Sequence, residues 1–482
     1  MKELSPRLLL FLFGIAFLVK FLTAMYIRYL IGCTPIDHHL DELVVHADDY
    51  FSYHGAMENY IQTGKYYFFN GRENVYAGRL PHYSIPYYLL RQVLNVAYTN
   101  FVIMILQIAG ECLAFIYLAK LALKITQSKL AFYLVYFIYL ISFLTSFYNN
   151  TVLPDSLSIS VLIFFLYFFH QYLFAPTAKT LWAAGLFLGW LVVLKPYFSL
   201  SYIEVGLFFI WQVKSVFSKK GIYQLFLKTS IVALPLLVFI TPWVLRNYGV
   251  HQTFIPFQVN TIAGYNYTSA DLACRRFLQS IGENFIEWEK TSAGNYFNKN
   301  CIAPCRYQLP AYAYTKNYDS AKVEQVRRAY LQLQHRYSVA QDHRVTAAFN
   351  QLTQSFRTEK PLYYYIIAPI MLSKKFLFTD TGYFLRFSCP GWSTTVTYLM
   401  QAILYWSTLL GGSVGLFWLT RKDWRHSIFI AIPIYLVIFF PILFRGIETR
   451  YFAHSFPVLL LGLVYFIHQI RSKLRINSPQ PI

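Results

Sequence analysis

The feature that most constrains this chain is a series of long apolar stretches that carry almost no charge. A membrane-spanning helix needs about 20 mostly apolar residues. Such stretches lie near residues 8–31, 99–119, 130–148, 154–174, 181–198, 200–217, 225–244, 396–419, 427–444 and 452–470. Only 13% of the 482 residues are charged, against about 25% in average soluble chains. We therefore expect an all-α polytopic membrane protein with about ten transmembrane helices, and exclude a cytosolic globular enzyme, a disordered protein and a nucleic-acid-binding module.

The basic residues between these stretches predict how the chain is oriented. The chain carries 42 Lys and Arg against 22 Asp and Glu, a net charge of +20. Cytoplasmic loops of membrane proteins are enriched in Lys and Arg. With ten spans and both termini inside, one side collects Lys2, Arg7, Lys120, Lys124, Lys129, Lys179, Lys214, Lys219, Lys220, Lys228, Arg421, Lys422, Arg425, Arg471, Lys473 and Arg475. This predicts a multi-pass plasma-membrane protein, as in the bacterial inner membrane, with both termini cytoplasmic.

The same orientation sends two long connections to the outer side. We expect an N-terminal transmembrane module over residues 1–247, with a first outer loop at 32–98. An outer, periplasmic segment follows at 248–395, and residues 396–482 form C-terminal transmembrane helices with a basic cytoplasmic tail. The apolar segments 83–97 and 361–373 are too short to span, so we expect them to lie as helices in the outer interface.

The first outer loop carries an acidic pair, aromatic sequence and a proline-bounded cation. Asp48 and Asp49 are adjacent, and Tyr53 follows four residues after Asp49. Arg79 opens the sequence RLPHYSIP, which contains His82 and is typical of a rigid turn. A solvated acidic loop explains the two acids equally well when they are taken alone. Their place directly after the first span, at membrane level, favours a functional site.

Histidines in the same loop raise the alternative of a metal site. With Asp48 or Asp49 they could supply nitrogen and oxygen ligands to a divalent ion. They are His38, His39, His46, His54 and His82. Their spacing is irregular and matches no metal-binding signature. We therefore expect no metal, and keep a divalent ion at Asp48 and Asp49 as the less favoured alternative.

Acids and bases also recur at the outer ends of the expected spans. They are Asp155, Lys195, Arg246, Asn247, Arg445, Glu448 and Arg450. Snorkelling and interfacial anchoring explain many such residues. Cations on the outer side oppose the positive-inside bias, however, and so need another purpose. A site for an anionic lipid head group at the outer boundary would supply one.

The order of these motifs resembles the GT-C superfamily of polyprenol-phosphate-sugar-dependent glycosyltransferases, which includes protein O-mannosyltransferases and the lipid A aminoarabinose transferase. Family members carry an acidic motif in the first outer loop, an Arg-containing turn after it, and an acid opening the fourth span. The matching positions here are Asp48-Asp49, Arg79-Leu-Pro-His82-Tyr-Ser, Pro154-Asp155, Gly185 and Gly189 followed by Lys195-Pro196, Pro242-Trp243-x-x-Arg246-Asn247-Tyr248, and Glu448-x-Arg450-Tyr451. The glycine and second proline of the family turn are absent, and Lys195 stands where the family has Arg.

The resemblance implies an inverting transfer of a hexose or pentose from a polyprenyl-phosphate donor, on the outer face of the membrane, as part of envelope glycan or lipid modification. The acceptor would be a lipid, a glycan or a protein. Asp49, and after it Asp48, would be the catalytic base. The donor phosphate would bind Arg79, Lys195, Arg246 and Arg450. The residues positioning substrate would be Asp155, Tyr53, His82, Asn247 and Glu448. With a phosphate acceptor no base is needed, and Asp49 would orient groups or hold a metal.

Two other classes of protein share this topology. A polymerase or ligase of lipid-linked oligosaccharides would carry the same outer cations, but the acidic pair in the first loop favours a monosaccharide transferase. A transporter or flippase of polyprenyl-linked sugars would place polar, broken-helix sites near the membrane midplane, often in paired repeats. This sequence has no internal repeat, and its polar residues lie at the ends of spans. We therefore favour the transferase.

Overall fold

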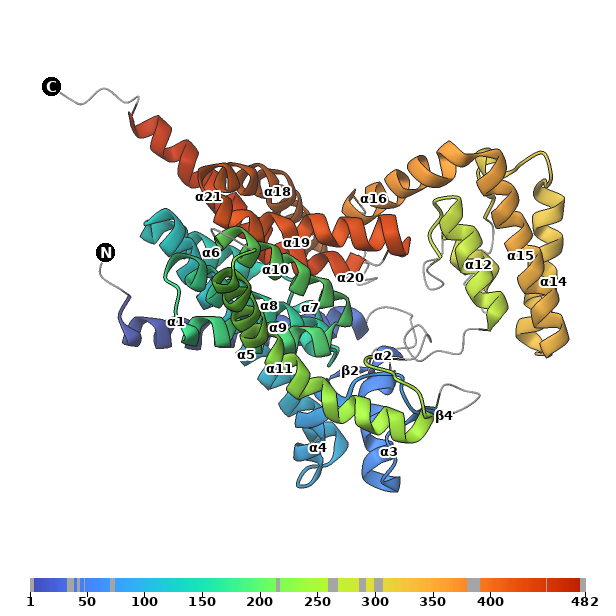
Figure 1. The fold of residues 1–482 in the computed structure, drawn as a ribbon, viewed down its shortest axis with the longest axis horizontal. Coiled ribbons are helices and arrows are strands. Elements are labelled where there is room, and N and C mark those ends of the chain that lie inside the picture. The colour runs from blue at the N-terminus through green and yellow to red at the C-terminus, as the bar shows by residue number, and fades with distance from the viewer. Residues whose placement is uncertain are drawn as a thin grey trace. The chain divides into compact units, whose positions relative to one another are not determined.

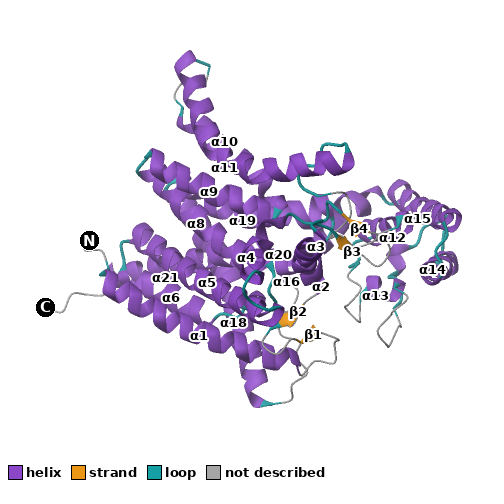
Figure 2. Cartoon of the chain, turned by 90° about the horizontal axis from the view of Figure 1, so that it is seen from below, coloured by secondary structure: helices purple, strands orange, loops and turns teal. Residues whose placement is uncertain are grey.

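A computed structural model describes residues 4–32, 39–40, 44–46, 48–69, 74–213, 217–258, 268–285, 292–298, 307–378, 391–447 and 449–476. These residues are predominantly helical, and the strands described among them form two short hairpins (Figure 2). The chain divides into two compact units. The first unit comprises Met1–Gly264, Thr381–Ile432 and Ala453–Ile482, and the second comprises Tyr265–Asp380 and Pro433–Phe452. The expectation of an all-α polytopic membrane protein is confirmed.

Seven helices among the described residues are long and apolar enough to cross a membrane (Figure 1). Five are single helices: α1 (Pro6–Gly32), α5 (Val96–Thr126), α8 (Pro154–Phe174), α11 (Lys219–His251) and α18 (Trp392–Lys422). The span Trp424–Phe444 combines η7 (Trp424–His426), α19 (Ser427–Val437) and η8 (Ile438–Phe444). The span Arg450–Leu474 combines α20 (Thr449–Phe452), η9 (Ala453–Ser455) and α21 (Phe456–Ile476).

The other three expected spans form shorter helices. They are α6 (Lys129–Ile141), α9 (Ala178–Leu194) and α10 (Ser201–Gln212), with 13, 17 and 12 residues. At a rise of 1.5 Å per residue they reach only about 18–26 Å, less than a hydrocarbon core of about 30 Å. Pro196 explains the end of α9, because a residue before proline is driven out of the helical conformation. Lys195 is accordingly extended, with φ −139° and ψ 90°, and the short η3 (Pro196–Leu200) follows.

Glycines allow α9 to pack directly against the backbone of α11. A Cβ atom built on Gly185 would lie 2.8 Å from the Cα of Val232, and one on Gly189 would lie 2.9 Å from the backbone nitrogen of Leu236. Small residues at this four-residue spacing let membrane helices approach closely. The Gly185-x-x-x-Gly189 pattern therefore has a structural explanation within the first unit.

The first outer loop folds into short elements of the first unit. β1 (His39–Leu40) pairs antiparallel with β2 (Val45–His46), and β3 (Phe68–Phe69) with β4 (Asn74–Val75). Between them run α2 (Asp48–Tyr50), the π-helical η1 (Phe51–Gly55) and α3 (Ala56–Thr63). The turn η2 (Pro81–Ser84) leads into α4 (Ile85–Arg91), and α7 (Phe147–Asn150) precedes α8.

The second unit has its own apolar core. Its elements are α12 (Ser269–Ser280), α13 (Ala293–Phe297), η5 (Ala311–Ala313), α14 (Ser320–His335), α15 (Val339–Glu359), η6 (Tyr363–Ile367) and α16 (Ala368–Phe378), together with η8 and α20. Figure 1 shows α14 and α15 side by side, and α12 packs on α15. Phe277, Phe297 and Phe349 are almost wholly buried between these helices. Side-chain caps at Thr268, Asp319 and Ser338 fix where three of them begin.

Candidate active site

An acid and a guanidinium that are 30 residues apart in the segment 32–98 meet in the first unit. Asp49 lies in α2, and Arg79 lies in the turn that leads to η2. Their Oδ1 and Nη2 atoms are 3.2 Å apart. The Nε of Arg79 also donates to the Ser52 hydroxyl over 3.4 Å, and that hydroxyl donates to the Asp49 carbonyl. The two charged side chains are 13% and 17% exposed, so the pair is sheltered but open to a substrate.

Tyrosines enclose this ion pair. The Arg79 guanidinium lies over the ring of Tyr53, 4.8 Å from its centroid, and Tyr53 in turn packs edge-on against Tyr83. Burial raises the pKa of Tyr66, as does Tyr53, whereas the positive charges of Arg246 and Arg79 lower it. Both guanidinium groups therefore act on one phenol. The Tyr66 hydroxyl is buried, and no group that the structure describes makes a hydrogen bond with it.

A second ion pair joins the starts of α8 and η3. Lys195 Nζ lies 2.8 Å from Asp155 Oδ1, and the two side chains are only 9% and 2% exposed. The carboxylate sits in the first turn of α8, where the helix dipole favours a negative charge. Burial raises the pKa of Tyr83, and the negative charge of Asp155 raises it further. The Tyr83 hydroxyl donates to Gln107 Oε1 over 2.6 Å. The second pair thus lies within electrostatic reach of the tyrosine that packs on Tyr53.

Arg246 and Asn247 hold backbone segments together. Arg246 donates to the carbonyl oxygens of Tyr66 and Tyr76, and to Asn247 Oδ1. Asn247 is fully buried and donates to the Ile255 carbonyl over 3.0 Å. Trp243 donates in the same way to Phe257, over 2.6 Å. The motif Trp243-x-x-Arg246-Asn247 therefore fastens the β3–β4 segment and the 255–257 turn to the end of α11.

Comparisons with known proteins include a distant structural likeness. No family model and no curated protein matches the chain. A solved structure of the archaeal oligosaccharyltransferase AglB from Archaeoglobus fulgidus, in complex with an inhibitory peptide and a dolichol-phosphate, is similar at 12% identity and a TM-score of 0.47. The match covers 98% of this chain and 52% of that one, so this chain spans about half the length of AglB.

The remaining predicted site residues are distributed as follows. His82 is half-buried, and its Nε2 donates to the Phe239 carbonyl over 2.9 Å; burial lowers its pKa. Arg450 belongs to the second unit, where its guanidinium lies over the Tyr451 ring at 5.3 Å. Glu448 and the side chain of Asp48 lie outside the described part of the chain.

The metal alternative gains no support from the described residues. No group of three or more His, Cys, Asp or Glu side chains that could hold an ion occurs among them. His54 is fully buried, with ring centroids of Tyr50, Tyr83 and Tyr87 at 5.2, 5.0 and 4.4 Å. Packing among tyrosines explains its burial. His38 and the side chains of His39 and His46 lie outside the described residues.

The ion pairs that the sequence analysis overlooked include Glu58–Arg91 and Lys20–Glu111. In the first loop, Glu58 accepts hydrogen bonds from Nη2 and Nε of Arg91, at 2.9 and 3.1 Å, and from the Tyr87 hydroxyl, at 3.0 Å. Within the spans, Lys20 Nζ lies 3.4 Å from Glu111, and both side chains are almost wholly buried. Charged residues inside the expected spans 8–31 and 99–119 were the available signal, since such residues are costly in a membrane.

A buried histidine beside the second ion pair was also overlooked. His454 in η9 is fully buried, and its Nε2 lies 2.8 Å from the Ser158 hydroxyl. That hydroxyl also donates to the Asp155 carbonyl over 2.8 Å. His454 stands three residues after the Arg450-Tyr451 motif, yet an isolated histidine in an apolar span gives no pattern from which its partner could be predicted.

Proposed function

We propose that this protein is a membrane glycosyltransferase that moves a sugar from a polyprenyl-phosphate donor to a hydroxyl acceptor on a lipid, glycan or protein. The observation that carries the proposal is the sheltered pair of Asp49 and Arg79, which offers a base and a phosphate-binding cation in one place. The order of the sequence motifs supports the same reaction class.

In the proposed step, the Asp49 carboxylate takes the proton of the acceptor hydroxyl. The acceptor oxygen forms a bond to the anomeric carbon of the sugar while the bond from that carbon to the phosphate oxygen breaks. The electron pair leaves with the polyprenyl phosphate, and the anomeric configuration inverts. A positioned general base contributes typically 10²–10⁴-fold to such a rate.

Arg79 would couple donor binding to activation of the base. In the pair, the Arg79 guanidinium occupies the Oδ1 atom of Asp49. A donor phosphate is a good bidentate partner for a guanidinium. When Arg79 turns to the phosphate, the Oδ1 atom of Asp49 can accept a hydrogen bond from the acceptor hydroxyl. The same guanidinium then stabilises the charge that gathers on the leaving phosphate.

We add Tyr66 to the proposed phosphate-binding residues and remove Lys195 from them. The buried Tyr66 hydroxyl stands within the field of both Arg79 and Arg246 and can donate to a phosphate oxygen. Lys195, which the family resemblance assigned to phosphate, is instead committed to Asp155. We therefore assign Lys195 to holding the Asp155 carboxylate at the start of α8.

From the sequence we further propose that the protein is a hexosyl- or pentosyltransferase of the bacterial inner membrane. Both termini would lie in the cytoplasm, and the reaction would take place on the outer face. The basic-residue pattern supports the orientation. A divalent ion at Asp48 and Asp49 forms no part of the proposed mechanism.

The test uses the full chain in phosphatidylcholine nanodiscs with polyprenyl-phosphate sugars and pooled acceptors, and measures released polyprenyl phosphate. Asp49→Asn should lose most turnover. Glu58→Gln is the matched control, because Glu58 is an acid of the same loop that is also paired with an arginine. Full activity in the Asp49 variant would overturn the assignment of the base. Movement of intact donor across a liposome membrane without cleavage would replace the transferase by a flippase.

A further inference from the structure

A pocket lies in the first unit at the far end of the helices that begin beside the candidate active site. Its volume is ≈ 360 Å³, within the range of about 300–1,000 Å³ of small-molecule sites. The last turns of α5 and α8 and the junction of α18 with η7 line it. Along α8, the 15 residues from Asp155 to His170 place it about 22 Å from the second ion pair. The proposed glycosyl transfer makes no use of this pocket.

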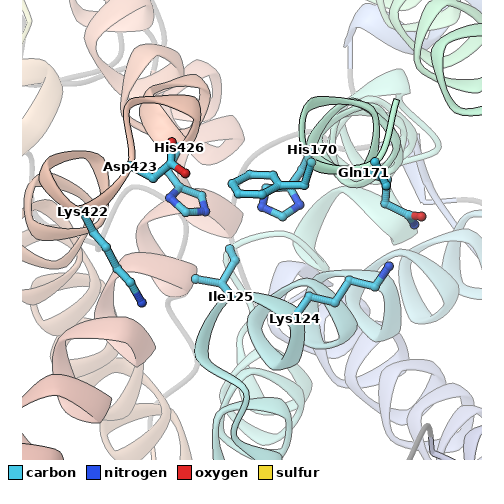
Figure 3. Close-up of a pocket in the computed structure, with 9 residues that line it drawn as sticks. Lys124, Ile125, His170, Gln171, Lys422, Asp423 and His426 are labelled. Atoms are coloured by element: carbon cyan, nitrogen blue, oxygen red, sulfur yellow. The ribbon is translucent and has the colours of Figure 1, made fainter. Parts of the chain in front are cut away.

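Two buried imidazoles form one wall of the pocket. His170 and His426 are 6% and 7% exposed, and their rings stack with centroids 5.4 Å apart. Phe174 packs on both, at 4.5 and 5.1 Å. Figure 3 shows the two imidazoles next to each other, one from α8 and one from η7. Both ring nitrogens of His170 and the Nδ1 of His426 make no hydrogen bond with any group that the structure describes.

The charge around these imidazoles is positive. Lys124 and Lys422 line the pocket as exposed side chains, and Figure 3 shows them on opposite sides of it. The acid in the lining, Asp423, is neutralised by Arg425, with Oδ2 and Nη2 only 2.6 Å apart. The guanidinium of Arg425 also lies over the Phe174 ring at 3.9 Å. The charged residues of the lining are therefore one acid that is already paired with Arg425 and two lysines.

Helix dipoles explain why lysines stand in the pocket lining, but they do not explain the two buried histidines. Lys124 and Lys422 lie in the last turns of α5 and α18, where cations balance the helix dipole. A buried polar group without a hydrogen-bond partner destabilises the fold. His170 has no described partner at either ring nitrogen, and His426 has none at Nδ1. A ring N–H in a pocket with a net positive lining is satisfied by an acceptor oxygen. A phosphate group supplies such oxygens, and the two lysines supply its counter-charge.

We propose that this pocket binds a phosphate-bearing anion, either the head group of a lipid or a free phosphate compound. The imidazole N–H groups of His170 and His426 donate to the phosphate oxygens, and Lys124 and Lys422 neutralise them. The site is separate from Asp49 and Arg79 and does not depend on the proposed transferase activity.

The test measures binding of two probes to the full chain in phosphatidylcholine nanodiscs by calorimetry. One probe is inorganic phosphate and the other is dihexanoyl phosphatidic acid. Lys422→Gln and His170→Phe should each weaken binding about tenfold, as expected when one charge-assisted hydrogen bond is lost. Lys179→Gln is the matched control, since Lys179 is an exposed lysine outside the pocket lining. Asp49→Asn should bind both probes like the unmodified protein.

Each result decides the proposal. Binding of phosphatidic acid alone identifies a lipid head group, and binding of both probes shows that the phosphate itself suffices. Lys422 is exposed, so its variant keeps the test valid if His170→Phe fails to fold. The proposal is overturned if neither probe binds, if Lys422→Gln keeps full affinity, or if Lys179→Gln weakens binding equally.

Discussion

At the scale of single residues, a variant of Tyr66 can separate an effect on donor binding from an effect on the stability of the fold. The Tyr66 hydroxyl is buried beside Arg79 and Arg246, and no described group makes a hydrogen bond with it. Removing an unsatisfied buried polar group is neutral or stabilising. The Tyr66 ring packs edge-on against Trp243 at 5.8 Å, and phenylalanine would keep this contact.

Tyr66→Phe should therefore leave the melting temperature unchanged or raise it, while it increases KM for the polyprenyl-phosphate donor about fivefold to tenfold. Thermal unfolding and initial rates on the same preparation check both effects. A fall in stability would show that the hydroxyl has a structural partner. An unchanged KM would remove Tyr66 from the donor site.

Asp49 and Arg79 should behave as a coupled unit. Asp49→Asn should lower kcat by about 10²–10⁴-fold, and Arg79→Gln should lower kcat and weaken donor binding. Because each acts through the other, the double variant should lose much less than the product of the two single losses. Steady-state kinetics on the three variants measure this coupling. Losses that simply multiply would mean that the two residues act independently.

Glu58 gives a pH dependence of stability with a defined sign. Hydrogen bonds from Arg91 lower the pKa of Glu58 below its ordinary value of 4.5, against the effect of burial. The pair therefore stabilises the fold fully above pH 4.5, and this contribution is lost as the pH falls through the lowered pKa. Glu58→Gln should melt below the unmodified protein at pH 7 and converge with it at acidic pH. A constant difference in melting temperature from pH 7 to pH 3 would contradict this reading.

At the scale of elements, helix ends and helix contacts decide how much the sequence could reveal. Apolar stretches located the long helices of the first unit, because a membrane segment shows its length and composition directly. They overestimated α6, α9 and α10, since Pro196 and the extended Ser142 end helices inside apolar sequence. The partners of Lys195 and Arg246 could not be read from the sequence, because residues 40 and 170 positions away supply them.

The contact of α9 with α11 should be sensitive to a single methyl group. Alanine in place of glycine gains up to about 1 kcal/mol of helix propensity, but overpacking a close contact costs about 1–3 kcal/mol. Gly189→Ala places its Cβ 2.9 Å from the backbone of Leu236. The cost of overpacking should therefore exceed the gain in helix propensity, and the variant should be less stable. Gly206→Ala in α10 meets nothing within 4 Å and should be neutral or stabilising. Melting temperatures of the two variants test this, and equal values would contradict the close packing.

At the scale of the whole molecule, the distribution of charge remains the argument for which face of the membrane each site occupies. Lys179 lies between α8 and α9, on the side that the basic residues predict to be cytoplasmic, whereas Lys322 lies in α14 within the long connection predicted to be outside. Both side chains are exposed. With Lys322→Cys in intact cells, a membrane-impermeant maleimide should react above the level of the unmodified chain. Lys179→Cys should react only after the cells are opened. The reverse pattern would place Asp49 and Arg79 on the cytoplasmic side and the His170–His426 pocket outside, and would exclude a donor presented on the outer leaflet.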